Sequence, residues 1–222
     1  MELTARPARR YKGITASERR AQRQERLLES GLELFGTQGY AKTSIRAICA
    51  AASVNSRYFY ESFGTREDLL FAVYERIATE IVTRTTEATA ERHTIEEQAQ
   101  AGLRAGWGIL TEDRRKARVV ALEVVGVSER LERLRRDTRH ALADLTARNT
   151  LAASGGRLRF RLDPVLTTRS LIGGVVDILV DWINEDLDAT VDEIVEHFTR
   201  LFTAVTYAAV EPASGADDGR GA

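Results

Sequence analysis

The chain has 222 residues, a formal net charge of −1, 43% hydrophobic residues and a single cysteine, Cys49. A chain of this length buries a substantial core, either as one large domain or as a small domain joined to a larger one. One cysteine excludes an intramolecular disulfide framework and any metal site built from several cysteines. Because Cys49 lies among apolar residues of a short helix, we expect a buried, inert thiol.

The basic residues are concentrated in the N-terminal part of the chain. Residues 1–66 contain 12 Lys and Arg against 6 Asp and Glu, whereas residues 67–222 contain 20 against 27. This asymmetry favours a polyanionic partner for the N-terminal part, although ordinary surface charge remains open. No apolar stretch approaches the roughly 18 residues needed to span a bilayer, and no signal-type segment begins the chain. We therefore expect a soluble, cytoplasmic protein that does not contact the membrane.

Helix-start signals mark four helices after residues 1–14, which we expect to form a flexible basic arm. Thr15, with Glu18 three residues later, forms a capping box for the first helix. Thr43 is the expected N-cap of the second helix and Asn55 that of the third. Thr65 with Asp68 opens a long fourth helix. Residues 15–63 thus form a predicted three-helix domain.

Two of these helices are very short and meet at a tight break, Ser53-Val54. Short helices bury little surface by themselves, so their arrangement must serve an outer surface. Small side chains on the first of the two let the second pack closely, and polar and aromatic groups then face outward. This layout is that of a helix-turn-helix, whose second helix enters the DNA major groove.

The rest of the chain is predicted to be helical, because alternating β-branched runs and Asn-Gly hairpin signals are missing. We place helices at 94–111, 113–125, 127–152, 163–185 and 189–210, and a loop at Ser154-Gly155-Gly156. Residues 64–211 form the expected larger C-terminal domain. The small, polar residues 212–222 are expected to be a disordered tail. The predicted fold class is therefore all-α.

The pattern from Phe35-Gly36 to Leu69 resembles the tetracycline-repressor (TetR) family of bacterial transcriptional regulators. The matching residues are Phe35, Gly36, Gly39, Tyr40, Thr43, Ser44, Ile45, Ile48, Ala52, Val54, Tyr60, Phe63, Glu67 and Leu69. The resemblance covers roughly a quarter of the chain, at residues 15–75. Ser53 stands where the family usually has Gly in the turn, and Arg66 where Lys is usual. The resemblance implies a helix-turn-helix domain followed by a helical domain for ligand binding and dimerisation.

The resemblance and the residue chemistry together give the candidate DNA contacts. The predicted base readers are Arg46, Ser56, Arg57 and Tyr58, since an Arg fork suits guanine O6 and N7 and a tyrosine suits a thymine methyl. The predicted phosphate contacts are Thr43, Ser44, Tyr60 and Arg66, whose donors bind anionic oxygen without reading sequence. Arg9, Arg10 and Lys12 of the arm are candidates for an adjacent minor groove, with plain disorder as the alternative.

For the C-terminal domain, the resemblance implies a homodimer on a palindromic operator and a small-molecule effector, with no cofactor. The predicted dimer surface contains Leu171, Val175, Ile178, Leu179, Trp182, Phe198, Leu201 and Val205. The predicted pocket contains Leu103, Trp107, Leu110, Val120, Glu123 and Val124. Packing within the protomer remains the alternative for each, because an apolar helix face must pack on something.

Catalytic and metal-binding signals are weak, so we expect no enzyme and no metal site. His93, His140 and His197 are scattered along the chain, and no phosphate-binding Gly loop or nucleophile elbow occurs. Two alternatives to a ligand-responsive repressor stay open. One is a helical interaction protein without sequence-specific DNA binding, and the other is a DNA-binding regulator that needs no ligand.

Overall fold

The structure, a computed structural model, describes residues 15–153, 159–160, 162–208 and 210–211. It divides into two compact units, Met1–Glu75 and Arg76–Ala222. The sequence placed the domain boundary at residue 63, whereas the division falls within helix α4 (Arg66–Thr89). In the described part of the chain, every regular element is a helix apart from one short strand pair, which confirms the all-α fold class.

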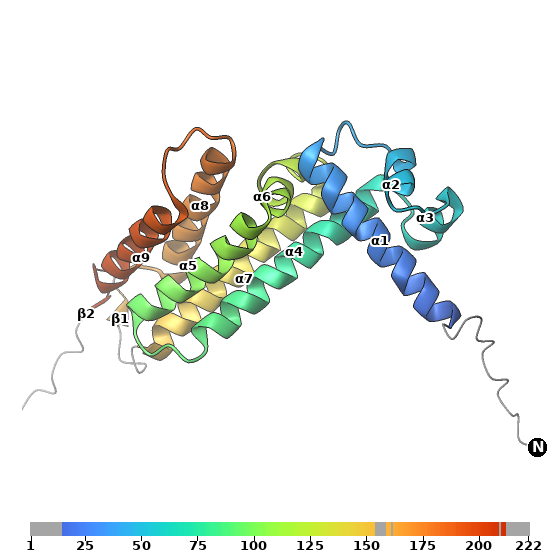
Figure 1. The fold of residues 1–222 in the computed structure, drawn as a ribbon. Helices are drawn as coiled ribbons and strands as arrows, with labels where there is room; N and C mark the ends of the chain where they lie inside the picture. Colours follow the sequence, from blue (N-terminus) through green and yellow to red (C-terminus); the bar gives the residue numbers. More distant parts are fainter. Residues whose placement is uncertain (1–14, 154–158, 161, 209, 212–222) are drawn as a thin grey trace, which may run out of the picture. The chain divides into compact units, whose positions relative to one another are not determined.

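The first unit contains α1 (Ala16–Thr37), α2 (Ile45–Ala51), α3 (Ser56–Ser62) and the beginning of α4 (Figure 1). The capping box of α1 is confirmed, with the Thr15 side chain accepting from the Glu18 N–H and the Glu18 carboxylate accepting from the Thr15 N–H. Asn55 caps α3 as predicted, with its side chain accepting from the Arg57 N–H. Local sequence therefore decides where α1 and α3 begin.

The predicted cap of α2 is wrong by one residue. Ser44 is the N-cap, and its side chain accepts from the Ala47 N–H. Thr43 is buried, and its hydroxyl donates to the carbonyl of Gly39 at 2.8 Å. The hydroxyl of Thr43 is used inside the fold, so the next residue caps the helix.

The core of the first unit fixes the angle of α3. Its largest fully buried side chains are Leu27, Phe35, Ile48, Phe59, Leu69, Leu70 and Val73. A side chain at Gly31 would bring its Cβ to 3.0 Å from Leu69 Cδ2, so glycine allows α1 and α4 to approach. Helices α2 and α3 each pack on α1 and on one another. Burial of Phe59 at 0% exposure leaves the other face of α3 turned outward.

The break between α2 and α3 depends on one left-handed residue. Ser53 has a φ of 51°, a conformation that glycine adopts more easily than any residue with a Cβ. The chain is held there by the Val54 N–H donating to the Cys49 carbonyl at 2.9 Å and the Ser53 N–H donating to the Ala50 carbonyl at 3.1 Å. Cys49 is buried, and this burial raises the pKa of its thiol.

The second unit contains the rest of α4 and the helices that follow it. These are α5 (Ile95–Glu112), α6 (Arg114–Arg118), α7 (Glu129–Ala153), α8 (Pro164–Ile183) and α9 (Val191–Ala208). Within it, α4, α5 and α7 run alongside one another (Figure 1). Helix α9 packs mainly on α5, and α8 mainly on α7. Its buried side chains include Trp107, Ile109, Val119 and Leu131.

The helix predicted at 113–125 is two segments. Asp113 caps α6, with its side chain accepting from the Arg115 N–H, and the π-helix η1 (Val119–Glu123) follows. The Arg115 guanidinium, by hydrogen bonding, lowers the pKa of the Asp113 carboxyl, which burial opposes. Apolar periodicity does not distinguish α-helical from π-helical bonding, which explains the difference.

One antiparallel strand pair also departs from the prediction. Strands β1 (Arg159–Phe160) and β2 (Val210–Glu211) pair Arg159 with Glu211 and Phe160 with Val210. Each strand has two residues, too few for an alternating pattern to be detected. The predicted arm at 1–14, the loop at 154–156 and the tail at 212–222 lie outside the described residues.

Candidate nucleic-acid interface

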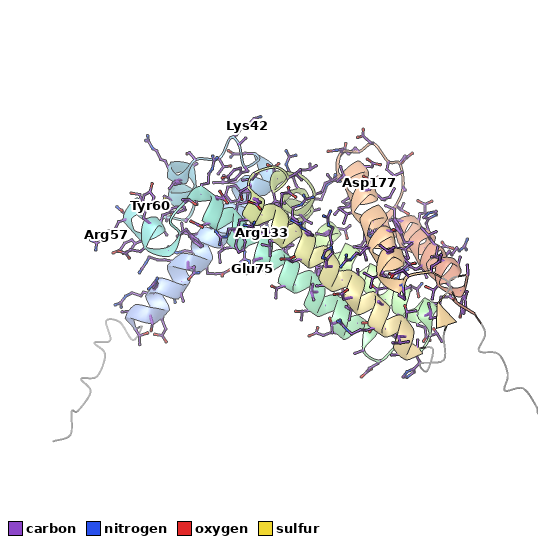
Figure 2. The ribbon with its side chains drawn as sticks, turned by 180° about the vertical axis from the view of Figure 1, so that it is seen from behind. Lys42, Arg57, Tyr60, Glu75, Arg133 and Asp177 are labelled. Carbon is purple, nitrogen blue, oxygen red and sulfur yellow. The ribbon has the colours of Figure 1, made fainter. Side chains whose placement is uncertain are left out.

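The outer face of α3 carries four of the predicted DNA contacts. Ser56, Arg57, Tyr58 and Tyr60 are all exposed, and Phe59 alone among their neighbours is buried. Figure 2 shows Arg57 and Tyr60 standing out from this short helix. Because residues on one helix face follow a period of 3.6, anchoring Phe59 in the core turns the other side chains outward. The structure thus brings the candidates together on one exposed helix.

Arg57 is paired within this surface. Its Nε donates to the Oε1 atom of Glu61 at 3.0 Å, one helical turn away. The Arg57 side chain is 82% exposed and that of Glu61 42% exposed. Pairs of this kind on a helix surface contribute only about 0.3–0.5 kcal/mol, so the pair can open when a stronger partner arrives.

Two arginines of α1, which sequence reasoning missed, contact the same helix. The Arg23 guanidinium carbon lies 4.3 Å from the centre of the Tyr58 ring. The Nη2 group of Arg20 donates to the Glu61 carbonyl at 3.2 Å, near the C-terminal end of α3. Their spacing of three residues puts them on one side of α1, although spacing alone does not say which helix that side meets. Arg23 holds the Tyr58 ring and keeps a cation beside it.

Helix α2 and the loop before it add further exposed polar groups. Arg46 is exposed, and Ser44 is exposed with its oxygen accepting from the Ala47 N–H at 3.1 Å. That bond leaves the Ser44 hydroxyl proton free to donate. Lys42, which sequence reasoning did not select, is exposed in the loop (Figure 2). The α2 side of the surface therefore offers two cations and one hydroxyl.

Thr43 and Arg66, both predicted to contact phosphate, have partners within the unit. Thr43 is 1% exposed, and its hydroxyl also reaches the Leu34 carbonyl at 3.3 Å. The half-buried Arg66 donates through Nη1 to the carbonyl of Thr43 and lies with its guanidinium carbon 4.1 Å from the Tyr40 ring centre. Thr43 thus has no side-chain surface to offer to DNA. Arg66 fastens α4 to the loop before α2.

The minor-groove candidates Arg9, Arg10 and Lys12 lie outside the described residues. Among the residues that the structure describes, no group of His, Cys, Asp or Glu is arranged to hold a metal ion. None of the described helices combines the length and apolarity that a membrane span requires.

The predicted pocket residues of the second unit are mostly packed into its core. Trp107, Leu110 and Val124 are buried, whereas Leu103 and Val120 are half-buried. Glu123 is only 12% exposed at its side chain and accepts from Arg118 Nε at 2.9 Å. This ion pair satisfies the carboxylate inside the protomer.

A small cavity lies elsewhere, between α7, α8 and α9. Its volume is about 30 Å³, room for about one water molecule. It is lined by Thr146, Ala147, Thr150, Pro164, Thr167, Thr168, Leu171, Phe202 and Thr206. None of the six predicted pocket residues lines it.

Among the described residues of the second unit, four buried polar atoms have no hydrogen-bond partner: Thr85 Oγ1, Gln98 Oε1, Trp107 Nε1 and Thr203 Oγ1. The Trp107 ring packs edge-on against Trp182, with ring centres 5.9 Å apart. Leaving a buried donor or acceptor unpaired costs about 1–3 kcal/mol. Such atoms in a native interior call for a water, a ligand or a functional reason.

The predicted dimer residues fall into two groups. Leu179 and Phe198 are buried within the protomer, which corrects their assignment to a dimer surface. Leu171, Val175, Ile178, Trp182 and Val205 are half-buried, and Leu201 is exposed. Helices α8 and α9 also expose Val165, Leu166 and Tyr207, which the sequence did not single out. Packing on α5 and α7 uses one side of each helix and leaves apolar groups on the other.

Comparison with known proteins agrees with this arrangement. Residues 27–73 match the family model described as bacterial regulatory proteins, tetR family. An HTH-type transcriptional repressor of Mycobacterium tuberculosis is 36% identical over 55 residues, which is 25% of this chain and 29% of that protein. The similarity to this relative is thus confined to less than a third of its length.

Solved structures share the fold over most of the chain. The fatty acid degradation regulator FadR from Bacillus halodurans superposes with a TM-score of 0.71 at 18% identity, covering 81% of this chain and 94% of that one. FadR from Bacillus subtilis, solved in complex with stearoyl-CoA, gives 0.71 at 19% identity, covering 80% and 96%. A TetR/AcrR-family regulator from Thermobifida fusca gives 0.63 at 24% identity, covering 81% and 96%. Residues 27–73 thus match the tetR family of bacterial regulatory proteins, and the solved structures share the fold over about four fifths of the chain.

Proposed function

We propose that the chain is a transcriptional regulator that binds double-stranded DNA through α3 and α2. The observation that carries this is the exposed row Ser56, Arg57, Tyr58 and Tyr60 on a helix anchored by buried Phe59. Arg57 and Arg46 supply forks for guanine, and Tyr58 supplies an apolar ring for thymine. Ser44, Tyr60 and Lys42 are placed to donate to phosphate oxygens. Such a protein would act in the cytoplasm, at the nucleoid.

The regulator is further proposed to work as a homodimer on a palindromic operator. One short recognition helix reads too few base pairs to specify a single site, and two copies a helical turn apart remove this limit. The candidate contacts on α8 and α9 are now the exposed and half-buried residues. They are Val165, Leu166, Leu171, Val175, Ile178, Trp182, Leu201, Val205 and Tyr207.

We also propose that a small-molecule effector binds the second unit. Its binding would release the protein from the operator, so that the protein acts as a repressor. The unpartnered Trp107 Nε1, Gln98 Oε1, Thr85 Oγ1 and Thr203 Oγ1 support it, since a ligand or water would satisfy them. The stearoyl-CoA in the Bacillus subtilis neighbour makes acyl-CoA thioesters the first compounds to test. An effector acts only if it binds two conformations with different affinity.

Selection of bound sequences from a random duplex pool tests the proposal directly. We expect a palindromic site, and we expect sedimentation of the complex to give two chains per duplex. Recovery of no preferred sequence would favour the alternative of a helical interaction protein. Recovery of a site without internal symmetry would refute the dimer and leave the regulator standing.

The effector is tested on the recovered operator. Acyl-CoA thioesters of increasing chain length are added to the complex, with free coenzyme A as the control. Release of DNA by a thioester and not by coenzyme A supports an effector of that class. Binding that none of them alters, with no change in thermal unfolding, favours the ligand-independent regulator.

A further inference from the structure

The pair formed by Arg57 and Glu61 places an acid on the surface that the proposed function turns towards DNA. Glu61 is exposed, and it lies one turn from Arg57 on the same seven-residue helix. A carboxylate there repels phosphate and so weakens binding to the DNA backbone. Weaker binding to the backbone is a disadvantage for a DNA-binding surface. The hydrogen bond between Arg57 and Glu61 indicates what this acid contributes in return.

The geometry of the pair leaves the useful end of Arg57 free. Only Nε of Arg57 is bonded to Glu61, at 3.0 Å. Among the described residues, the two Nη groups of Arg57 have no partner. A guanidinium held through Nε presents Nη1 and Nη2 together at its far end. That is the end that can bond guanine O6 and N7 with two parallel N–H donors.

The position of Glu61 itself is fixed from a second helix. Arg20 of α1 donates to the backbone carbonyl of Glu61 at 3.2 Å, and Phe63, two residues later, is buried in the core. The backbone that carries the acid is therefore tied to α1 and to the interior. The carboxylate serves Arg57 as an attachment point on an ordered part of the chain.

We propose that Glu61 is a positioning residue that makes Arg57 a reader of bases. It holds the guanidinium by Nε with both Nη groups directed outward, and it discourages Arg57 from binding phosphate. Specific binding keeps the pair, because a guanine uses the Nη end. Non-specific binding opens it, because a phosphate competes with the carboxylate for the same cation. This inference rests on the proposed DNA binding.

The test uses Glu61→Gln in the full-length chain, with Glu75→Gln as the matched control, because Glu75 is an exposed acid of the same unit (Figure 2). Affinities are measured for the selected operator, for the operator with the Arg57-contacted guanine replaced by 7-deazaguanine, and for a scrambled duplex. The contacted guanine is identified beforehand: its replacement weakens binding by the wild type and leaves the affinity of Arg57→Ala unchanged.

We expect Glu61→Gln to bind the scrambled duplex about 3-fold more tightly and the operator no more tightly. We expect the loss caused by 7-deazaguanine, about 10-fold in the wild type, to shrink below 3-fold. The slope of log affinity against log salt on the scrambled duplex should steepen by about one, as for one added phosphate contact. Glu61→Asp, with a shorter side chain, should behave as Glu61→Gln, because it cannot reach Nε in the same geometry.

Several outcomes would overturn the inference. Equal tightening of Glu61→Gln on the operator and on the scrambled duplex would mean that Glu61 acts by simple charge repulsion. An unchanged response to 7-deazaguanine would mean that Arg57 is positioned without it. A wild-type chain that selects no duplex would overturn the proposed function itself, whereas a selecting wild type with an unaltered Glu61→Gln overturns this inference alone.

Discussion

In the first unit, the buried side chain of Thr43 gives its hydroxyl to the Gly39 carbonyl at 2.8 Å, and the side chains suited to binding lie outside. In the second unit, Thr85, Gln98, Trp107 and Thr203 bury polar atoms that have no partner. Within the described residues, all such atoms belong to the second unit. The first unit is complete as it stands and binds with its surface. The second has unmet hydrogen-bonding capacity in its interior, as expected of a domain that takes up water or a ligand.

The largest effect is expected from removing the anchor of the completed unit. Phe59→Ala should destabilise the first unit by about 3–5 kcal/mol, because Phe59 is 0% exposed and contacts the Phe63 ring with centres 5.9 Å apart. Hydrogen exchange resolved by segment should show lost protection in α2 and α3 and retained protection in α7. Tyr60→Phe, which leaves an exposed ring in place, is the control. Equal loss of protection in α7 would break the distinction between the units.

Arg57→Ala sharpens the claim that the first unit binds with its surface. We expect a loss of about 1–3 kcal/mol of specific binding and relaxed preference at one base pair, measured by titration of operator variants. Lys42→Ala, also exposed, should instead weaken binding by a similar factor on every sequence. A uniform loss in Arg57→Ala would assign that residue to phosphate.

A pair of threonines on α4 tests the unmet bonding capacity of the second unit. Thr85 Oγ1 is buried without a partner, whereas Thr89 Oγ1 accepts from Asn149 Nδ2 at 3.0 Å. Thr85→Val should stabilise the protein by about 1 kcal/mol, and Thr89→Val should cost about 1–3 kcal/mol because it strands the amide of Asn149. Urea unfolding measures both. A loss in Thr85→Val comparable to that in Thr89→Val would indicate a structural water at Thr85.

The smallest effect concerns the turn between α2 and α3. Ser53→Gly should stabilise the first unit by about 0.5–1 kcal/mol, because Ser53 pays for a φ of 51° that glycine adopts freely. Ala50→Gly, inside α2, should destabilise by a similar amount. Thermal unfolding of both variants shows whether each substitution stabilises or destabilises the first unit. A loss in Ser53→Gly would show that its hydroxyl has a role at the turn.

Short-range signals in the sequence were sufficient for the helix starts. Thr15 with Glu18, Asn55, and Asp163 before Pro164 act on backbone groups two or three residues away, so their partners are fixed by spacing. Thr43 and Ser44 show the limit of such signals. Both carry a hydroxyl, and only the packing of Thr43 against the Gly39 carbonyl decides which one caps α2.

Long-range contacts could not be predicted in this way. Phe198 and Leu201 are three residues apart on α9, yet the first is buried and the second is 37% exposed, because the side packed on α5 is set by tertiary structure. Arg23 was missed for the same reason. Arg23 contacts the Tyr58 ring of another helix, 35 positions along the chain, and only the tertiary structure brings the two together. The candidate base readers on α3 were found because this short helix buries Phe59 and exposes Ser56, Arg57 and Tyr58.

The π-helical segment η1 bears on how chains of this kind are aligned. Bonding from i to i+5 accommodates one residue more than an α-helical turn. Ala117, before this segment, and Leu131, after it, are both at 0% exposure. A relative with one residue fewer at 119–123 would run there as a regular α-helix with both buried positions preserved. We therefore expect a single-residue gap at this point of an alignment to mark a change of helix type.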